Sequence, residues 1–70
     1  MNSHRRKVLV GIALNIEMYR ERVETNRKHE QASWPKGSPA IERLLKAEAL
    51  LREASGYICR ATQSDALFKE

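Results

Sequence analysis

Both prolines of the 70-residue chain lie in one short segment, between two long stretches with the hydrophobic spacing of helices. Pro35 disfavours helical conformation at the residue before it, so a first helix has to end near this point. Ser38 can cap the free amide groups of a second helix, and Pro39 suits the first helical position, where its missing N–H costs nothing. We therefore expect a hinge at residues 32–38 that separates two helices.

Apolar residues recur at alternating spacings of three and four on both sides of this hinge. Such spacing places them on one stripe of a helix. The stripes predict a first helix over about residues 3–31, a second over about 39–62 and a tail at 63–70. The expected seam residues are Leu9, Ile12, Ile16, Tyr19 and Val23 in the first helix and Leu44, Ala47, Leu51, Ala54, Ile58 and Ala61 in the second, widened by Leu50 and Tyr57.

The short hinge determines how these two helices should pair. A connection of about six residues is typical of antiparallel neighbours in helical bundles. The two seams should therefore face each other in an antiparallel two-helix hairpin. We expect an all-α protein in which residues 1–70 form a single domain.

The first half of the N-terminal helix carries apolar residues on a second side. Val10, Leu14 and Met18 lie close to the side opposite the seam, and Gly11 beside them would allow another helix to approach closely. One partner helix cannot cover both sides, and the single cysteine rules out a stabilising disulfide within the chain. We therefore expect the hairpin to pair into a four-helix homodimer through Val10, Gly11, Leu14 and Met18.

A three-helix monomer is the alternative to this dimer. A last turn holding Leu67 and Phe68 would then fold back over Val10 and Leu14. The tail is short for this role, because short helices are only marginally stable by themselves. The dimer is the arrangement that the sequence favours.

The sequence lacks a recognisable set of catalytic or metal-binding residues. His4 and His29 have no ligand-type residue four positions further on, and the hairpin would hold His29 far from Cys59. We find no glycine-rich phosphate loop and no nucleophile elbow, and the glutamates alternate with arginines instead of converging. We expect neither enzyme activity nor a cofactor.

The amino terminus resembles a secretory leader only in its first part. Three basic residues at 5–7 precede an apolar run at 8–16, but Asn15 interrupts the run and no small-residue cleavage site follows. The run is also too short to cross a membrane, which takes about 20 apolar residues. We expect a cytoplasmic protein with a reduced thiol at Cys59 and no membrane partner.

Trp34, the only tryptophan, lies in the hinge. Its ring either packs over the end of the hairpin against Ile41 or Leu44, or forms an exposed anchor for another protein.

The basic residues at positions 5–7 are unfavourably placed, because the amino end of a helix disfavours positive charge. They are neutralised either by the carboxyl end of the second helix together with Asp65, or by an acidic partner. The net charge of +4 favours acidic partners in general. The candidate partner-binding residues are Arg5, Arg6, Lys7, Trp34 and Lys36.

These features together predict a small regulatory or inhibitory module without enzyme activity. It should form a homodimer and bind a partner protein. An RNA- or DNA-binding regulator that uses paired basic helix ends is the alternative.

Overall fold

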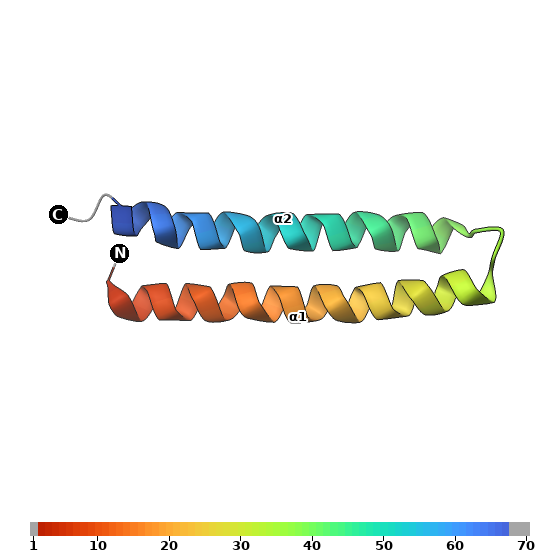
Figure 1. Cartoon of the computed structure of the whole chain (residues 1–70), viewed down its shortest axis with the longest axis horizontal. Helices are drawn as coiled ribbons and strands as arrows, with labels where there is room; N and C mark the ends of the chain where they lie inside the picture. The colour runs from red at the N-terminus through yellow and green to blue at the C-terminus, as the bar shows by residue number, and fades with distance from the viewer. Residues whose placement is uncertain (1, 68–70) are drawn as a thin grey trace.

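In a computed structural model of the chain, two long helices lie side by side and run in opposite directions (Figure 1). Helix α1 spans Ser3–Ser33 and helix α2 spans Pro39–Leu67. The structure describes residues 2–67, with side chains for residues 2–63. The molecule measures 55 × 15 × 11 Å along its principal axes. The prediction of an all-α antiparallel hairpin is confirmed.

Both ends of α1 are closed by hydrogen bonds. At its start, the Asn2 side chain accepts a hydrogen bond of 2.8 Å from the backbone N–H of Arg5. At its end, the Trp34 N–H donates to the Glu30 carbonyl, and the Trp34 carbonyl accepts from the Gly37 N–H. Gly37 has a φ of +98°, a conformation that glycine adopts readily and other residues rarely do. The helix thus ends two residues later than predicted, at Ser33.

Helix α2 begins at Pro39, as the proline pattern predicted. The backbone carbonyl of Ser38 accepts a hydrogen bond of 3.1 Å from the Ile41 N–H. The Ser38 hydroxyl donates to Glu30 Oε2 at 3.1 Å instead of serving the free amides of α2 as expected. This hydroxyl therefore ties the start of α2 to the end of α1.

The carboxyl end of α2 lies at Leu67, whereas the sequence predicted it near Thr62. No glycine or proline follows Gly56, so no residue with a strong preference against helix stops it. The Thr62 hydroxyl donates to the Cys59 carbonyl at 2.7 Å, a bond that is compatible with helical backbone. The chain consequently does not fold back over α1 before Phe68, which lies outside the described residues.

The contact between the helices follows a seven-residue repeat with spacings of three and four. The residues on this seam are Arg6, Leu9, Ala13, Ile16, Arg20, Val23, Arg27 and Glu30 of α1 and Ile41, Leu44, Glu48, Leu51, Ser55, Ile58 and Thr62 of α2. All of them are buried or half-buried. Every second layer of the seam is apolar, as predicted, except at Glu30 beside the hinge, and these layers include Ile16, Leu51 and Ile58.

The alternate layers of the seam differ from the prediction. Ile12 and Tyr19 remain 42% and 53% exposed, and Ala54 and Ala61 are also exposed. The neighbouring residues one position further along the chain take their places, and they are Ala13, Arg20, Ser55 and Thr62. Polar groups are tolerated in these layers because each finds a hydrogen-bond partner within the hairpin, as Arg20 does with Glu17.

The hairpin has very little core. Among the apolar side chains of residues 2–63, only Ala13 and Ile41 are buried. The chain exposes 5584 Å², against about 4,500 Å² for a compact monomer of this mass. Its radius of gyration is 16.0 Å, against about 11 Å for a compact domain of this length. A single hairpin therefore leaves about 1,100 Å² more surface in contact with water than a compact fold would.

Candidate interaction surfaces

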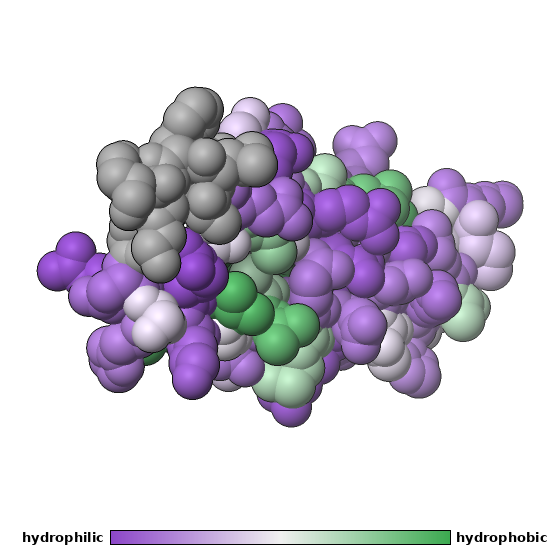
Figure 2. Space-filling model, turned by 60° about the vertical axis from the view of Figure 1, so that its left-hand side comes forward, coloured by the Kyte–Doolittle hydropathy of each residue, from purple (hydrophilic) through white to green (hydrophobic). Residues whose placement is uncertain are grey.

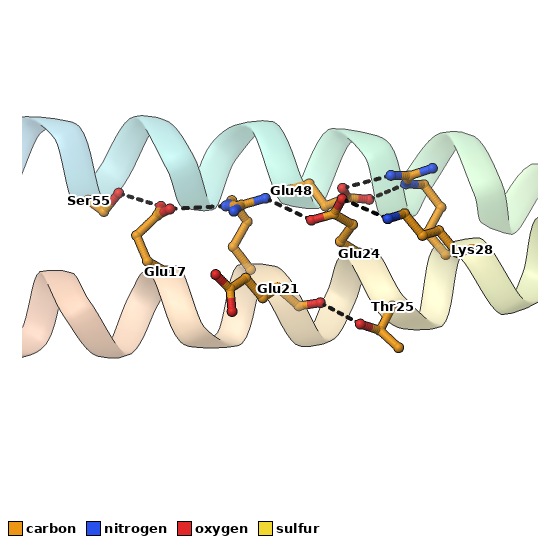
Figure 3. Close-up of polar contacts among 9 residues, drawn as sticks. Glu17, Glu21, Glu24, Thr25, Lys28, Glu48 and Ser55 are labelled. Carbon is orange, nitrogen blue, oxygen red and sulfur yellow. Dashed lines mark hydrogen bonds and ion pairs between the residues drawn. The ribbon is translucent and has the colours of Figure 1, made fainter.

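One side of the hairpin carries a chain of charged contacts, drawn in Figure 3. Glu17 accepts hydrogen bonds from the Ser55 hydroxyl at 2.8 Å and from Arg20 Nε at 3.2 Å. Arg20 Nη1 also donates to Glu24 at 3.3 Å, and Lys28 Nζ lies 3.3 Å from the other oxygen of Glu24. We call this surface the charged side. Its acidic and basic groups largely neutralise each other.

An ion pair joins the two helices nearer the hinge. Arg27 Nε donates to Glu48 Oε2 at 2.5 Å, and Arg27 Nη2 donates to Glu48 Oε1 at 3.3 Å. The two side chains are only 14% and 12% exposed. The hydrogen bonds to Glu48 raise the pKa of Arg27 above its ordinary value. The alternation of glutamates and arginines in the sequence did not predict this partly buried pair.

The contacts on the charged side also shift two carboxylates. The hydrogen bond from Ser55 and then the one from Arg20 lower the pKa of Glu17 below its ordinary value of 4.5. The pKa of Glu24 is lowered mainly by its hydrogen bond with Lys28. Both groups therefore favour the charged form in the folded hairpin.

Acid should weaken the hairpin for this reason. A carboxylate whose pKa is lower in the folded chain than in the unfolded chain stabilises the fold at pH values above its unfolded-state pKa. This stabilisation is lost as the pH falls through the folded-state pKa. We expect the melting temperature to be steady near neutral pH and to fall below about pH 4.5, the ordinary value for Glu17. Circular dichroism melts between pH 7 and pH 2.5 would measure this.

The variant Glu17→Gln should show a smaller loss between pH 7 and pH 2.5 than the wild type, because it lacks one of the shifted carboxylates. Glu53→Gln, which changes an exposed carboxylate of α2, is the matched control and should follow the wild type. Equal acid sensitivity in the wild type and Glu17→Gln would contradict the assignment.

Three of the residues assigned to a dimer interface lie exposed on α1, and two of them, Val10 and Leu14, immediately follow seam residues and so border the charged side. Val10, Leu14 and Met18 are 40%, 66% and 41% exposed. A Cβ added to Gly11 would meet no atom within 4 Å. Figure 2 shows hydrophobic side chains gathered among hydrophilic ones in the lower half of the view, where α1 runs. We call Val10, Gly11, Leu14 and Met18 the outer patch.

A larger apolar surface includes both helices, and we call it the two-helix face. It consists of Val8, Ile12 and Tyr19 of α1 and Ala47, Leu50, Ala54, Tyr57 and Ala61 of α2. Each of these residues immediately precedes a seam residue. Because the helices are right-handed and antiparallel, the residues that precede the seam on α1 and on α2 lie on the same side of the hairpin. The charged side lies opposite, since Glu17 and Glu24 immediately follow seam residues.

The two-helix face also differs from the charged side in its charges. From residue 5 to residue 61, no position that immediately precedes a seam residue carries a carboxylate. The charged residues at such positions are Arg5, Arg22 and Arg43. Arg22 lies over the ring of Tyr19, with 5.4 Å between the guanidinium carbon and the ring centre. The α2 part of the face is therefore apolar from Ala47 to Ala61. The α1 part is apolar at Val8, Ile12 and Tyr19, with Asn15 between the last two, and is polar nearer the hinge at Arg22, Asn26 and His29.

The partner-binding candidates lie at both ends of the 55 Å molecule and do not form one site. Arg5 and Lys7 are exposed at the amino end of α1, while Arg6 is half-buried at a seam position. The first turn of α1 contains no acidic residue. Asp65, suggested as a neutralising group, lies outside the residues whose side chains are described.

Trp34 and Lys36 lie exposed at the opposite end, in the hinge. Trp34 is 59% exposed. The expectation that the Trp34 ring packs over the hairpin end against Ile41 or Leu44 is therefore wrong in that more than half of the Trp34 surface is uncovered. Its backbone explains this position, because its N–H and carbonyl are both used to end α1.

Within residues 2–63, no three side chains of the metal-ligating types come together in a way that could hold a metal ion. Cys59 is exposed and has a free thiol. In the part of the chain that the structure describes, neither α1 nor α2 has a stretch with the length and hydrophobicity needed to cross a membrane.

The chain was compared with known protein families, with curated proteins and with solved structures. It matches no family, and it has no significant similarity to a curated protein or to a solved structure. The surfaces described above are therefore the basis for any functional assignment.

Proposed function

We propose that this protein is a small interaction module, without enzyme activity, that self-associates and binds a partner protein. The observation that supports this most is the amount of apolar surface left on the single hairpin. Ten large hydrophobic side chains of the described residues keep 40–66% of their surface exposed. Five of them belong to the two-helix face, and contiguous apolar surface usually marks a place where another chain binds.

The elongated shape of the module supports a regulatory or inhibitory action. A rod of two helices offers long exposed faces with which it would occlude or bridge the surfaces of other proteins. Trp34 is the best candidate for the anchor, since tryptophan is enriched among the residues that dominate binding energy. A cytoplasmic location is part of the proposal and fits a protein with one free cysteine.

The substitution Trp34→Ala tests the protein-binding function. Trp34 is 59% exposed, so the variant should melt within a few degrees of the wild type. We expect it to lose roughly tenfold or more of its affinity for the partner captured by the tagged wild type. Lys46→Ala, at another exposed position, should bind like the wild type. Equal capture by the wild type and Trp34→Ala would rule out Trp34 as the anchor.

An RNA- or DNA-binding regulator is the second candidate. It is favoured by Arg5 and Lys7, which are exposed in a first turn without acidic residues. Self-association would bring two such basic ends into one particle. Binding to phosphates weakens steeply with salt, whereas an apolar protein interface does not. Capture that disappears after nuclease treatment and at high salt would support this candidate against the protein partner.

A further inference from the structure

We infer that a second copy of the chain docks on the two-helix face, so that α1 of each copy packs against α2 of the other. This inference rests on the proposed function, in that both require self-association. It assigns the interface to a different surface from the outer patch that the sequence analysis favoured. Four observations support it.

The first is the amount of surface that needs cover. The chain exposes 5584 Å², which is about 1,100 Å² more than a compact monomer of its mass. A stable interface of standard size removes about 800 Å² from each partner. A second copy is present wherever the protein is present, so it can supply this cover at all times. A twofold pair covers the same surface on both chains at once.

The second observation is the pattern on each helix. A helix with one neighbour needs apolar residues only at its seam, whereas a helix in a four-helix bundle needs an adjacent apolar row as well. Both helices have this row, and on both it immediately precedes the seam. The outer patch, in contrast, belongs to α1 alone. It has three large apolar residues, against five on the two-helix face, so it would bury less surface.

The third observation is a match in side-chain size. The part of the face on α1 carries the bulky residues Ile12 and Tyr19. On α2, small residues of the face, namely Ala47, Ala54 and Ala61, alternate with the bulky Leu50 and Tyr57. Facing helices pack best when large side chains meet small ones. A pair in which α1 lies on the partner's α2 satisfies this condition twice, once for each copy.

The fourth observation is the level of these residues along the rod. The pairs Arg27–Glu48 and Glu17–Ser55 fix which residues of α1 and α2 lie opposite each other. In this register, Tyr19 is level with Ala54. A twofold axis parallel to the helices keeps every residue at its level. It therefore places Tyr19 of one copy against the partner's Ala54, and all neighbouring helices run antiparallel.

The charges are compatible with this arrangement. The face has no carboxylate between residues 5 and 61, so docking leaves no buried acidic group without a partner. Arg22 and Arg43 lie towards the hinge and can stay at the rim. The ion pairs of the charged side lie on the opposite surface and remain in water.

Two matched alanine substitutions test the face. Ala54→Glu puts a charge into the proposed interface, whereas Ala49→Glu puts the same charge on the charged side of the same helix. Both alanines are exposed in the single hairpin. By sedimentation equilibrium we expect the wild type and Ala49→Glu at twice the 8.1 kDa of one chain, and Ala54→Glu at 8.1 kDa.

A mixing experiment covers the case in which a single variant fails to fold. Tyr19→Arg should dissociate the pair in the same way as Ala54→Glu. An equimolar mixture of the two variants should recover the doubled mass and the helical signal. In the mixed pair, the introduced arginine of one chain meets the introduced glutamate of the other, and the second copy of this contact is unchanged. Ala49→Glu mixed with Tyr19→Arg is the control and should not recover a mixed dimer.

The results separate the inference from the proposed function. A dimeric Ala54→Glu, or a mixture that does not recover, would overturn the two-helix face as the interface. If Leu14→Glu is monomeric while Ala54→Glu is still dimeric, the interface is the outer patch, and the proposed self-association stands. A wild type of 8.1 kDa at every concentration would rule out both the two-helix interface and the proposed self-association. An increase in mass only after RNA is added would assign the face to nucleic acid.

Discussion

Replacing Glu48 by alanine should destabilise the protein more than any change at an exposed ion pair. Glu48 accepts two hydrogen bonds from Arg27, and both side chains are largely covered by the two helices. Removal of one member leaves the guanidinium partly buried without its counter-charge. Lys28→Ala, which removes an ion pair whose lysine is 66% exposed, should have little effect by comparison. Urea denaturation followed by circular dichroism would rank the two variants.

A double substitution shows whether the loss comes from the unpaired charge. Apolar residues of similar size often replace a buried ion pair without loss of stability. Arg27→Leu combined with Glu48→Leu should therefore be clearly more stable than Glu48→Ala. If Glu48→Ala unfolds at the same urea concentration as Lys28→Ala, the pair does not hold the helices together.

The substitution Ile41→Ala should be the most damaging change to the apolar part of the seam. Ile41 is 8% exposed and is the only large apolar side chain of the described residues that is buried. Removal of a buried isoleucine side chain to alanine costs about 2–5 kcal/mol, and we expect a value of about 2–3 kcal/mol in so thin a core. The free energy of unfolding from urea titration would measure this.

Leu45→Ala is the control for Ile41→Ala, because Leu45 lies one turn further along α2 and is 44% exposed. It should cost less than about 1 kcal/mol. Equal losses for the two variants would mean that α2 does not pack on α1 through the face that contains Ile41.

The hinge and the antiparallel pairing could be predicted from the sequence because local chemistry determines them. Pro39 can only begin a helix, and Gly37 provides the positive φ that the turn needs. The end of α2 was predicted too early because no strong stop signal exists after Gly56, so the prediction had relied on the last residue of the apolar stripe. Helix ends without such signals are poorly determined by sequence.

The rotation of the helices about their own axes could not be predicted from hydrophobicity. Leu9, Ile16 and Val23 belong to two possible seams, one completed by Ile12 and Tyr19 and the other by Ala13 and Arg20. Hydrophobicity favours the first, but the structure has the second. Charge pairing across the helices favours the second, in which Arg27 meets Glu48. A search for opposite charges at matching levels of the two helices would have indicated it.

This rotation also changes where function should be sought. Residues that were expected to hold the hairpin together, such as Ile12, Tyr19 and Ala54, are on its outside. Within one chain, the seam combines apolar and polar layers, and the apolar residues beside it stay exposed. In the arrangement that we propose, these residues are covered by a second copy of the chain.

The mass of the wild-type protein in solution tests this account most directly. Sedimentation equilibrium should be carried out from low micromolar to millimolar concentration at neutral pH. The account predicts a particle of twice the 8.1 kDa chain mass, with dissociation only at the lowest concentrations. A folded particle of 8.1 kDa throughout this range would contradict it.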